Sequence, residues 1–220
     1  TTLLGSAVSL SGSYNGFWTS PTFGSPTFPV GSNPFLTVGA GAHYLGFLSP
    51  FWNKGTTSIN ADLASAIKQR TVNPPLERTT SFTQDTILAG YAQRDSDTPD
   101  LGYHYEPLDF CWTGLSLNNS TLTLTNGVAL GLYGAAGLQL QAGAKLTSQG
   151  SPNALNRIGR PVVVQEQYSG TWLATASSMA LLKVAGAYTP RPEIRMRFTE
   201  MVIPSMNSEQ QRWLNCNQSP

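Results

Sequence analysis

The sequence predicts an all-β fold in which short strands stack as the coils of a β-solenoid, and three observations lead to this prediction. Apolar residues alternate in brief pairs over residues 113–158, as expected for short strands with one buried face. Gly114-Leu115-Ser116-Leu117 recurs 23 positions later as Gly137-Leu138-Gln139-Leu140, and a period in the low twenties is typical of one solenoid coil. Charged residues make up only 11% of the chain, which suits stacked strands because like charges ~4.8 Å apart would repel.

The predicted strands in this stretch are three to five residues long, and Gly and Asn separate them. Each strand has alternating apolar positions: Leu115/Leu117, Leu122/Leu124, Val128/Leu130, Leu138/Leu140 and Ala144/Leu146, followed by Leu155 and Ile158. The same alternation would also fit a β-sandwich with short antiparallel hairpins. The two folds differ in whether neighbouring strands run parallel or antiparallel.

Composition excludes several classes of protein. The chain has 220 residues, with 13 Lys plus Arg against 12 Asp plus Glu, so no basic excess is present to attract nucleic acid. No stretch approaches 18 consecutive apolar residues, and we expect no membrane span. We expect no signal peptide, because the sequence opens without an initiator Met or a basic region, and both ends suggest a processed product or a fragment of a longer protein.

Residues 1–110 are predicted to form a loop-rich β segment with one short helix. Residues 20–29 carry several prolines and predict an extended surface loop rather than a helix or a central strand. A helix of about ten residues is expected after Asn60, which can cap it, and before Asn73-Pro74-Pro75. Residues 79–86 and 101–105 are predicted as strands, with Tyr103 and Tyr105 on one face and His104 on the other.

Residues 111–220 are predicted to form the solenoid coils, continuing beyond the chain. Alternation continues over 162–164 and 168–173, 179–182 is a further apolar run, and 208–214 predicts a short helix. Arg195 and Arg197 share one strand face, where they form either an anion patch or, as we expect, a solvated face paired with Glu193 and Glu200.

One segment resembles a known family. Residues 95–105 read Asp-Ser-Asp-Thr-Pro-Asp-Leu-Gly-Tyr-His-Tyr. They are similar to the Asp-Leu/Ile-Gly-Tyr-His-Tyr segment of bacterial right-handed parallel β-helix repeat proteins. These proteins have a pectin-lyase-like fold and are frequent among large secreted or surface proteins of planctomycetes and verrucomicrobia. Asn33-Pro34-Phe35-Leu36 and Ser49-Pro50 precede the segment in the order that such proteins often show.

The resemblance covers about residues 30–150 and bears on fold and location. It implies a right-handed parallel β-helix with a loop-rich N-terminal part and one short helix, in an extracellular or cell-surface protein. It implies little about chemistry, because one fold carries many functions.

Candidate site residues fall into two groups. Asp95, Asp97 and Asp100 form the one tight acidic cluster and are candidate calcium ligands, although such residues more often order a turn before a proline such as Pro99. His104 follows the cluster and is expected to order the turn or pack rather than to catalyse. Trp18, Phe23 and Phe28, beside Phe17, are candidates for stacking on sugar, against the simpler role of packing the loop down.

The remaining special residues carry no motif. Cys111 and Cys216 can form one disulfide or stay as two separate buried thiols. The only histidines, His43 and His104, have no metal-site spacing. The sequence contains no nucleophile elbow and no phosphate-binding loop.

Two functions from different classes follow. The first is a non-catalytic structural or adhesive β-helix segment of a large secreted or cell-surface bacterial protein. Its partners would be other chains, the rest of a longer β-helix, or carbohydrate. The second is a polysaccharide lyase or glycoside hydrolase of the pectin-lyase-like type. We expect the first, because such enzymes need clustered carboxylates and the chain has 12 acids. A groove holding Asp109, Glu106 and an Arg would favour the second. No cofactor is expected other than calcium.

Overall fold

The computed structural model describes residues 10–166, 179–184, 186–203 and 211–216. Its strands are β1 (Asn15–Trp18), β2 (Thr27–Val30), β3 (Phe35–Val38), β4 (Gly41–Leu45), β5 (Leu76–Glu77), β6 (Thr86–Leu88), β7 (Phe110–Leu117), β8 (Thr121–Leu124), β9 (Ala129–Leu140), β10 (Lys145–Gln149), β11 (Asn156–Gly159), β12 (Met179–Val184), β13 (Glu193–Arg197), β14 (Thr199–Val202) and β15 (Gln211–Cys216). One α-helix, α1 (Ala61–Ile67), and a 3-10 turn over Pro161–Val163 complete the described elements. The expected all-β class is confirmed.

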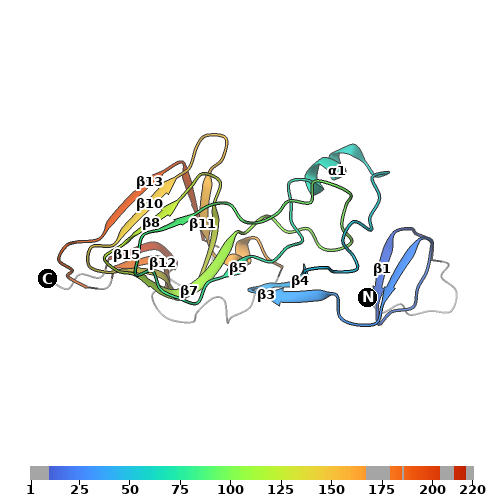
Figure 1. Ribbon diagram of the computed structural model, residues 1–220, viewed down its shortest axis with the longest axis horizontal. Coiled ribbons are helices and arrows are strands. Elements are labelled where there is room, and N and C mark those ends of the chain that lie inside the picture. Colours follow the sequence, from blue (N-terminus) through green and yellow to red (C-terminus); the bar gives the residue numbers. More distant parts are fainter. Residues whose placement is uncertain (1–9, 167–178, 185, 204–210, 217–220) are drawn as a thin grey trace.

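Two large parallel sheets contain the described strands from β5 to β15 (Figure 1). The smaller sheet has the order β13-β10-β8-β6. The larger sheet has the order β14-β11-β9-β12-β15, in which β9 also pairs with β7, and β7 pairs with β5. From β6 to β10 the chain alternates between the two sheets, so that neighbours in a sheet are two strands apart in sequence. The parallel pairing between such strands requires each connection to cross to the other sheet and return.

The 23-residue repeat has a direct structural counterpart. Leu115 lies opposite Leu138, and Leu117 lies opposite Leu140, in the parallel pair of β7 and β9. Leu122 of β8 lies opposite Leu146 of β10. Apart from an isolated antiparallel bridge at Ser151, the described strand pairs within 113–158 are parallel, so short antiparallel hairpins do not form there.

Strands β7 and β9 are longer than the predicted three to five residues. β7 has eight residues and β9 has twelve. The register between them shifts at Gly114, which has φ +65°, and β9 contains Gly134 with φ +74°. Glycine adopts these left-handed conformations without the steric cost that other residues have. The chain therefore bends inside one continuous strand, where the pattern predicted separate short strands.

The main hydrophobic core lies between the two parallel sheets. Both sheets contribute to it, because it includes Trp112, Leu132 and Leu138 from the larger sheet and Leu124 and Leu146 from the smaller one, all buried. Leu124, Leu138 and Leu146 belong to the alternating pairs that the sequence analysis identified. A row of leucines that stack on leucines removes apolar surface from water along the whole length of the sheets.

The N-terminal part contains two small sheets and the helix. β1 pairs with β2 in parallel, and β3 pairs with β4 antiparallel. The predicted helix is confirmed over Ala61–Ile67, and the Asn60 side chain accepts from the backbone N–H groups of Asp62 and Leu63. A smaller core of Leu45, Phe51 and Val72 lies under these elements.

Several local predictions differ from the structure. Residues 101–105 form no strand and only a single bridge between Thr71 and Tyr105, because side-chain contacts of the 95–104 turn hold this segment. Within 79–86 only Thr86 belongs to a strand. Residues 27–29 of the predicted loop belong to strand β2, with Pro29 tolerated in a two-stranded sheet. Residues 161–163 form the 3-10 turn, and 211–216 form β15 beside β12 instead of a helix. Residues 168–173 and 208–210 lie outside the described residues.

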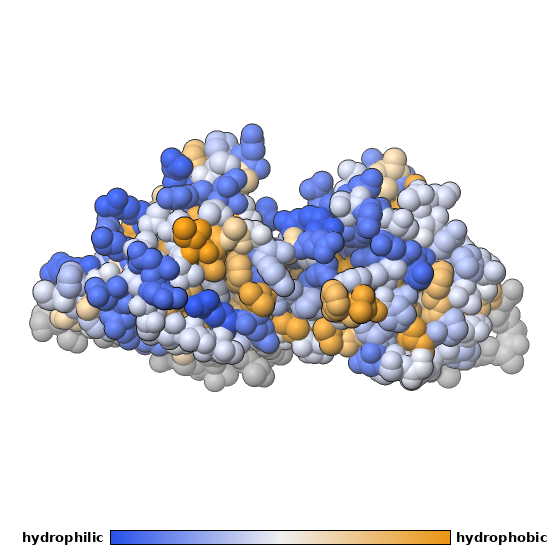
Figure 2. Space-filling model, in the orientation of Figure 1, coloured by the Kyte–Doolittle hydropathy of each residue, from blue (hydrophilic) through white to orange (hydrophobic). Residues whose placement is uncertain are grey.

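The surface seen in Figure 2 is mostly hydrophilic, and the hydrophobic residues form separate patches. No single broad apolar stripe crosses this face. Among the described residues, no helix is long and apolar enough to cross a membrane.

Candidate functional site

An aromatic cavity of about 810 Å³ lies beside β1. Its aromatic lining comes from Phe17, Trp18, Phe23, Phe35 and Phe51, and Thr19, Ser20 and His43 add polar groups. The cavity thus combines flat apolar faces with a few hydrogen-bonding groups, which is the composition of small-ligand sites.

The predicted sugar-stacking residues separate in the structure. Trp18 and Phe23 line the aromatic cavity, whereas Phe28 does not and instead packs on the core of Leu45, Phe51 and Val72. Trp18 is partly exposed, and the rings of Phe17 and Phe23 meet edge to face at 5.1 Å. Phe23 therefore packs the loop down while also forming part of the wall, and Trp18 is the aromatic side chain best exposed to a ligand.

A polar cluster that the sequence analysis did not single out reaches the edge of this cavity. His43 of β4 lines the cavity, and its Nδ1 lies 2.8 and 2.6 Å from the two carboxylate oxygens of Glu166. The Tyr105 hydroxyl donates to Glu166 and accepts from the His43 backbone N–H. Burial, together with the hydrogen bond to Glu166, raises the pKa of Tyr105 above its ordinary value.

Neighbouring contacts hold this cluster in place. Gln165 accepts from the Ala40 backbone N–H at 2.7 Å and donates to the Val38 carbonyl and the Tyr44 hydroxyl. The Tyr44 ring stacks on Tyr105 with 4.1 Å between ring centroids. Residues 165–166 are thereby tied to β3 and β4.

The His43–Glu166 pair has the arrangement of a general base or acid. The His43 side chain is 49% exposed and that of Glu166 is 16% exposed, so the carboxylate is more sheltered than the ring it contacts. A carboxylate on one ring nitrogen orients the imidazole and leaves the other ring nitrogen to face a ligand, which is how such pairs support proton transfer. His43 and Glu166 are 123 positions apart, and no local spacing could have linked them.

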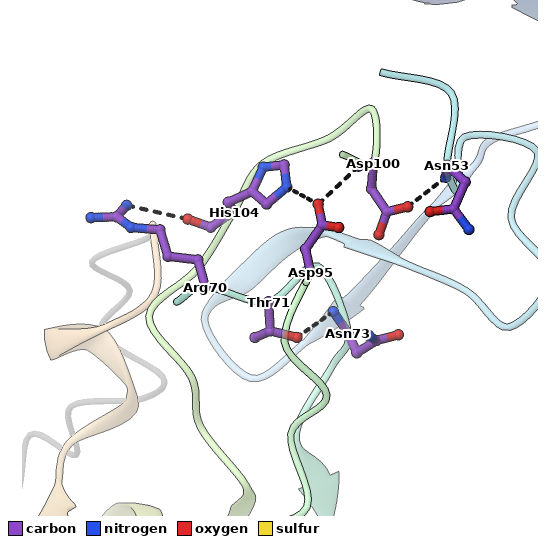
Figure 3. Close-up of polar contacts among 7 residues, drawn as sticks. All are labelled: Asn53, Arg70, Thr71, Asn73, Asp95, Asp100 and His104. Atoms are coloured by element: carbon purple, nitrogen blue, oxygen red, sulfur yellow. Dashed lines mark hydrogen bonds and ion pairs between the residues drawn. The ribbon is translucent and has the colours of Figure 1, made fainter. Parts of the chain in front are cut away.

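The acidic cluster is brought together only in part (Figure 3). Asp95 Oδ2 lies 2.7 Å from His104 Nε2 and accepts from the Asp100 backbone N–H at 2.8 Å. Asp100 Oδ1 accepts from the Asn53 backbone N–H at 2.6 Å. Asp97 is exposed. In this arrangement Asp95 and His104 order the turn.

The surroundings of Asp100 shift the pKa of its carboxyl group. Burial raises the pKa of Asp100 to about 6, and the nearby charges of Asp95 and Asp97 act in the same direction. Among the described residues there is no group of three or more His, Cys, Asp or Glu side chains arranged to hold a metal ion.

Asp109, Glu106 and an arginine do not form the common groove that would favour a polysaccharide-cleaving enzyme. Asp109 is 1% exposed, and its carboxylate accepts from the backbone N–H groups of Tyr91, Ala92 and Ala129. Glu106 pairs with Arg70 at 3.2 Å and lines a separate hollow of about 490 Å³ with Arg94 and Arg157. Asp109 is therefore occupied with backbone contacts and does not line the hollow that contains Glu106.

The other special residues have structural surroundings. Cys111 is buried in β7, Cys216 is exposed in β15, and both are free thiols. Arg195 pairs with Glu193, and Arg157 pairs with Glu200 at 3.1 Å. Arg195 and Arg197 are thus exposed, and Arg195 contacts one of the two expected glutamates, whereas Glu200 pairs with Arg157 of β11 instead.

These observations define the class: an all-β protein of stacked parallel strands with an aromatic cavity at its N-terminal part. No protein-family model, no curated protein and no solved structure matches the chain.

Proposed function

We propose that the chain is a segment of a right-handed parallel β-helix and serves as a non-catalytic structural or adhesive module of a large secreted or cell-surface bacterial protein. The observation that carries this proposal is the in-register stacking of equivalent positions, Leu115 on Leu138 and Leu122 on Leu146. Both parallel sheets share the intervening core. The resemblance of residues 95–105 supports the handedness and the location.

Open strand edges support a role in assembly. Within the described residues, β6 and β13 are the outer strands of the four-stranded sheet. The outer strand of a sheet has backbone groups that can pair with a further coil or with another chain. Because the hydrophobic residues form only separate patches on the face seen in Figure 2, edge pairing is favoured over association through a broad apolar face there.

End-to-end assembly can be tested at one row of side chains that runs across the four-stranded sheet. Ile87, Thr123, Thr147 and Arg195 lie opposite one another across β6, β8, β10 and β13. If a second copy stacks end to end, its β6 adds beside β13 and its residue 87 lies against Arg195. Ile87 is 72% exposed, so a charge is tolerated there without loss of core packing.

We expect the Ile87→Lys variant to associate about tenfold or more weakly than the matched Ile87→Glu variant, because Lys repels Arg195 and Glu attracts it. Sedimentation velocity over a range of concentrations measures the association. A chain that is monomeric at every concentration, or two variants that associate equally, would contradict end-to-end stacking.

The adhesive part of the proposal rests on the aromatic cavity. We expect the chain to bind at least one immobilised polysaccharide from a panel of uronates and neutral glucans. The Trp18→Ala variant should bind it about tenfold or more weakly, because a single Trp side chain commonly contributes most of the binding energy. Phe47→Ala is the matched control, because Phe47 is highly exposed and lies outside the cavity lining. Equal loss in both variants, or no binding at all, would count against an adhesive cavity.

The alternative is a polysaccharide lyase or glycoside hydrolase, and one observation favours it: the His43–Glu166 pair at the edge of the same cavity. Release of unsaturated or reducing sugar ends that His43→Ala abolishes would establish the enzyme and overturn the non-catalytic proposal.

A further inference from the structure

A small polar hollow of about 50 Å³ lies beside the 95–100 turn. Oxygen-bearing side chains surround it: Asn53, Asn73, Gln93, Asp95, Asp97 and Asp100. A site for one water molecule needs roughly 10–15 Å³ of such space. The hollow therefore has room for an ion with a few water molecules.

One oxygen at this hollow has no partner. The Asp95 side chain is 1% exposed, and its Oδ1 is buried without a hydrogen-bond partner. Its other oxygen, Oδ2, is already engaged by His104 and by the Asp100 backbone N–H. A buried carboxylate oxygen without a partner is costly, so a ligand at Oδ1 would relieve this cost.

The carboxyl groups of buried Asp95 and half-buried Asp100 lie at the same hollow. In Figure 3 the carboxyl groups of Asp95 and Asp100 lie side by side, with the Asn53 side chain next to Asp100. Asp100 uses one oxygen for the Asn53 backbone N–H, and its other oxygen has no hydrogen bond among the described residues. The hollow thus combines negative charge with neutral amide oxygens.

The positively charged side chain of Arg94 lies beside the hollow but contacts a backbone carbonyl. Arg94 lines the hollow and donates to the Ala92 carbonyl at 3.2 Å. Burial lowers the pKa of the Arg94 guanidinium, and the charges of Asp109 and Glu106, which lie outside the hollow, oppose that shift. Among the described residues, Arg94 therefore contacts a backbone carbonyl and forms no ion pair with Asp95 or Asp100.

We propose that this hollow binds a calcium ion through the Asp95 and Asp100 carboxylates and the amide oxygen of Asn53. Oxygen donors of this kind are the ligands that hard cations prefer, and calcium accepts their irregular geometry better than magnesium. His104 holds Asp95 Oδ2 and so orients the carboxylate from outside the site. The ion would join two separate segments, around residues 53 and 95–100. This site is independent of the proposed assembly and adhesive functions.

Terbium luminescence tests the site directly, because Trp52 lines the hollow and can transfer excitation energy to a bound Tb³⁺ ion. We expect the full chain to show tryptophan-sensitised Tb³⁺ emission that added Ca²⁺ displaces. Asp95→Asn should weaken Ca²⁺ affinity by about tenfold or more. Asp62→Asn is the matched control, since Asp62 is exposed in the first turn of α1 and lies outside the hollow.

Calorimetry and thermal unfolding complete the test. Trp52→Phe should abolish the sensitised emission while the calorimetric Ca²⁺ affinity remains. If Asp95→Asn fails to fold, Asn53→Ala and the wild-type calorimetric titration take its place. Ca²⁺ should raise the Tm of the wild type and not that of Asp95→Asn. Absence of Ca²⁺ heat and of a Tm shift in the wild type, or equal loss of affinity in Asp62→Asn, would overturn the proposal.

Discussion

Asp109→Ala is expected to lower the free energy of unfolding by about 3–5 kcal/mol, because hydrogen bonds to a buried charged group are strong and three backbone donors lose their acceptor at once. The Asp109 carboxylate lies 2.7, 2.8 and 2.6 Å from the backbone nitrogens of Tyr91, Ala92 and Ala129. It thus ties the segment after β6 to the start of β9. Urea unfolding measures the change.

Asp85→Ala is the matched control for this prediction. Asp85 is exposed and accepts a single backbone hydrogen bond, from Thr121 at 2.7 Å. Its loss should cost about 1 kcal/mol or less. If the two variants are equally destabilised, the buried carboxylate does not join these segments as described.

Leu138→Ala is expected to cost about 2–5 kcal/mol, because removing a fully buried leucine loses apolar contacts and leaves a cavity. Leu138 is 0% exposed in β9 and lies between Leu115 of β7 and Leu182 of β12. Neighbouring strands on both sides limit how far the core can collapse into the gap. Urea or thermal unfolding provides the measurement.

Leu155→Ala is the control, because Leu155 is exposed and lies outside the strands. It should change stability by about 0.5 kcal/mol or less. A small effect of Leu138→Ala, comparable with that of Leu155→Ala, would contradict a tight core between the two sheets.

The repeat pattern correctly predicted which strand positions lie opposite each other. The 23-residue recurrence placed Leu115 and Leu138 as equivalent positions, and they are opposite each other in the structure. The alternating pairs predicted which leucines are buried, as at Leu122 and Leu124. The cap at Asn60 located the helix. These are local properties of the chain, since burial of alternate residues and capping depend on near neighbours in sequence.

The candidate sites were predictable only in part. The cluster of Asp95 and Asp100 is visible in sequence, because a short turn keeps its members close. The pairing of His43 with Glu166 is not visible, because it depends on how residues 165–166 dock on β3 and β4. Asp109 was considered as a possible catalytic acid, but the structure surrounds it with backbone donors from segments 17 to 20 positions away.

By itself, the sequence determined the all-β class, the repeat spacing of residues 113–158 and the one helix, because hydrophobic periodicity, glycine placement and capping are local. The tertiary structure decided the parallel pairing, the continuous strands β7 and β9, and the side chains that surround each hollow. Those features depend on contacts between segments far apart in the chain. The energies of such contacts depend on burial and geometry, which exist only once the segments have packed together.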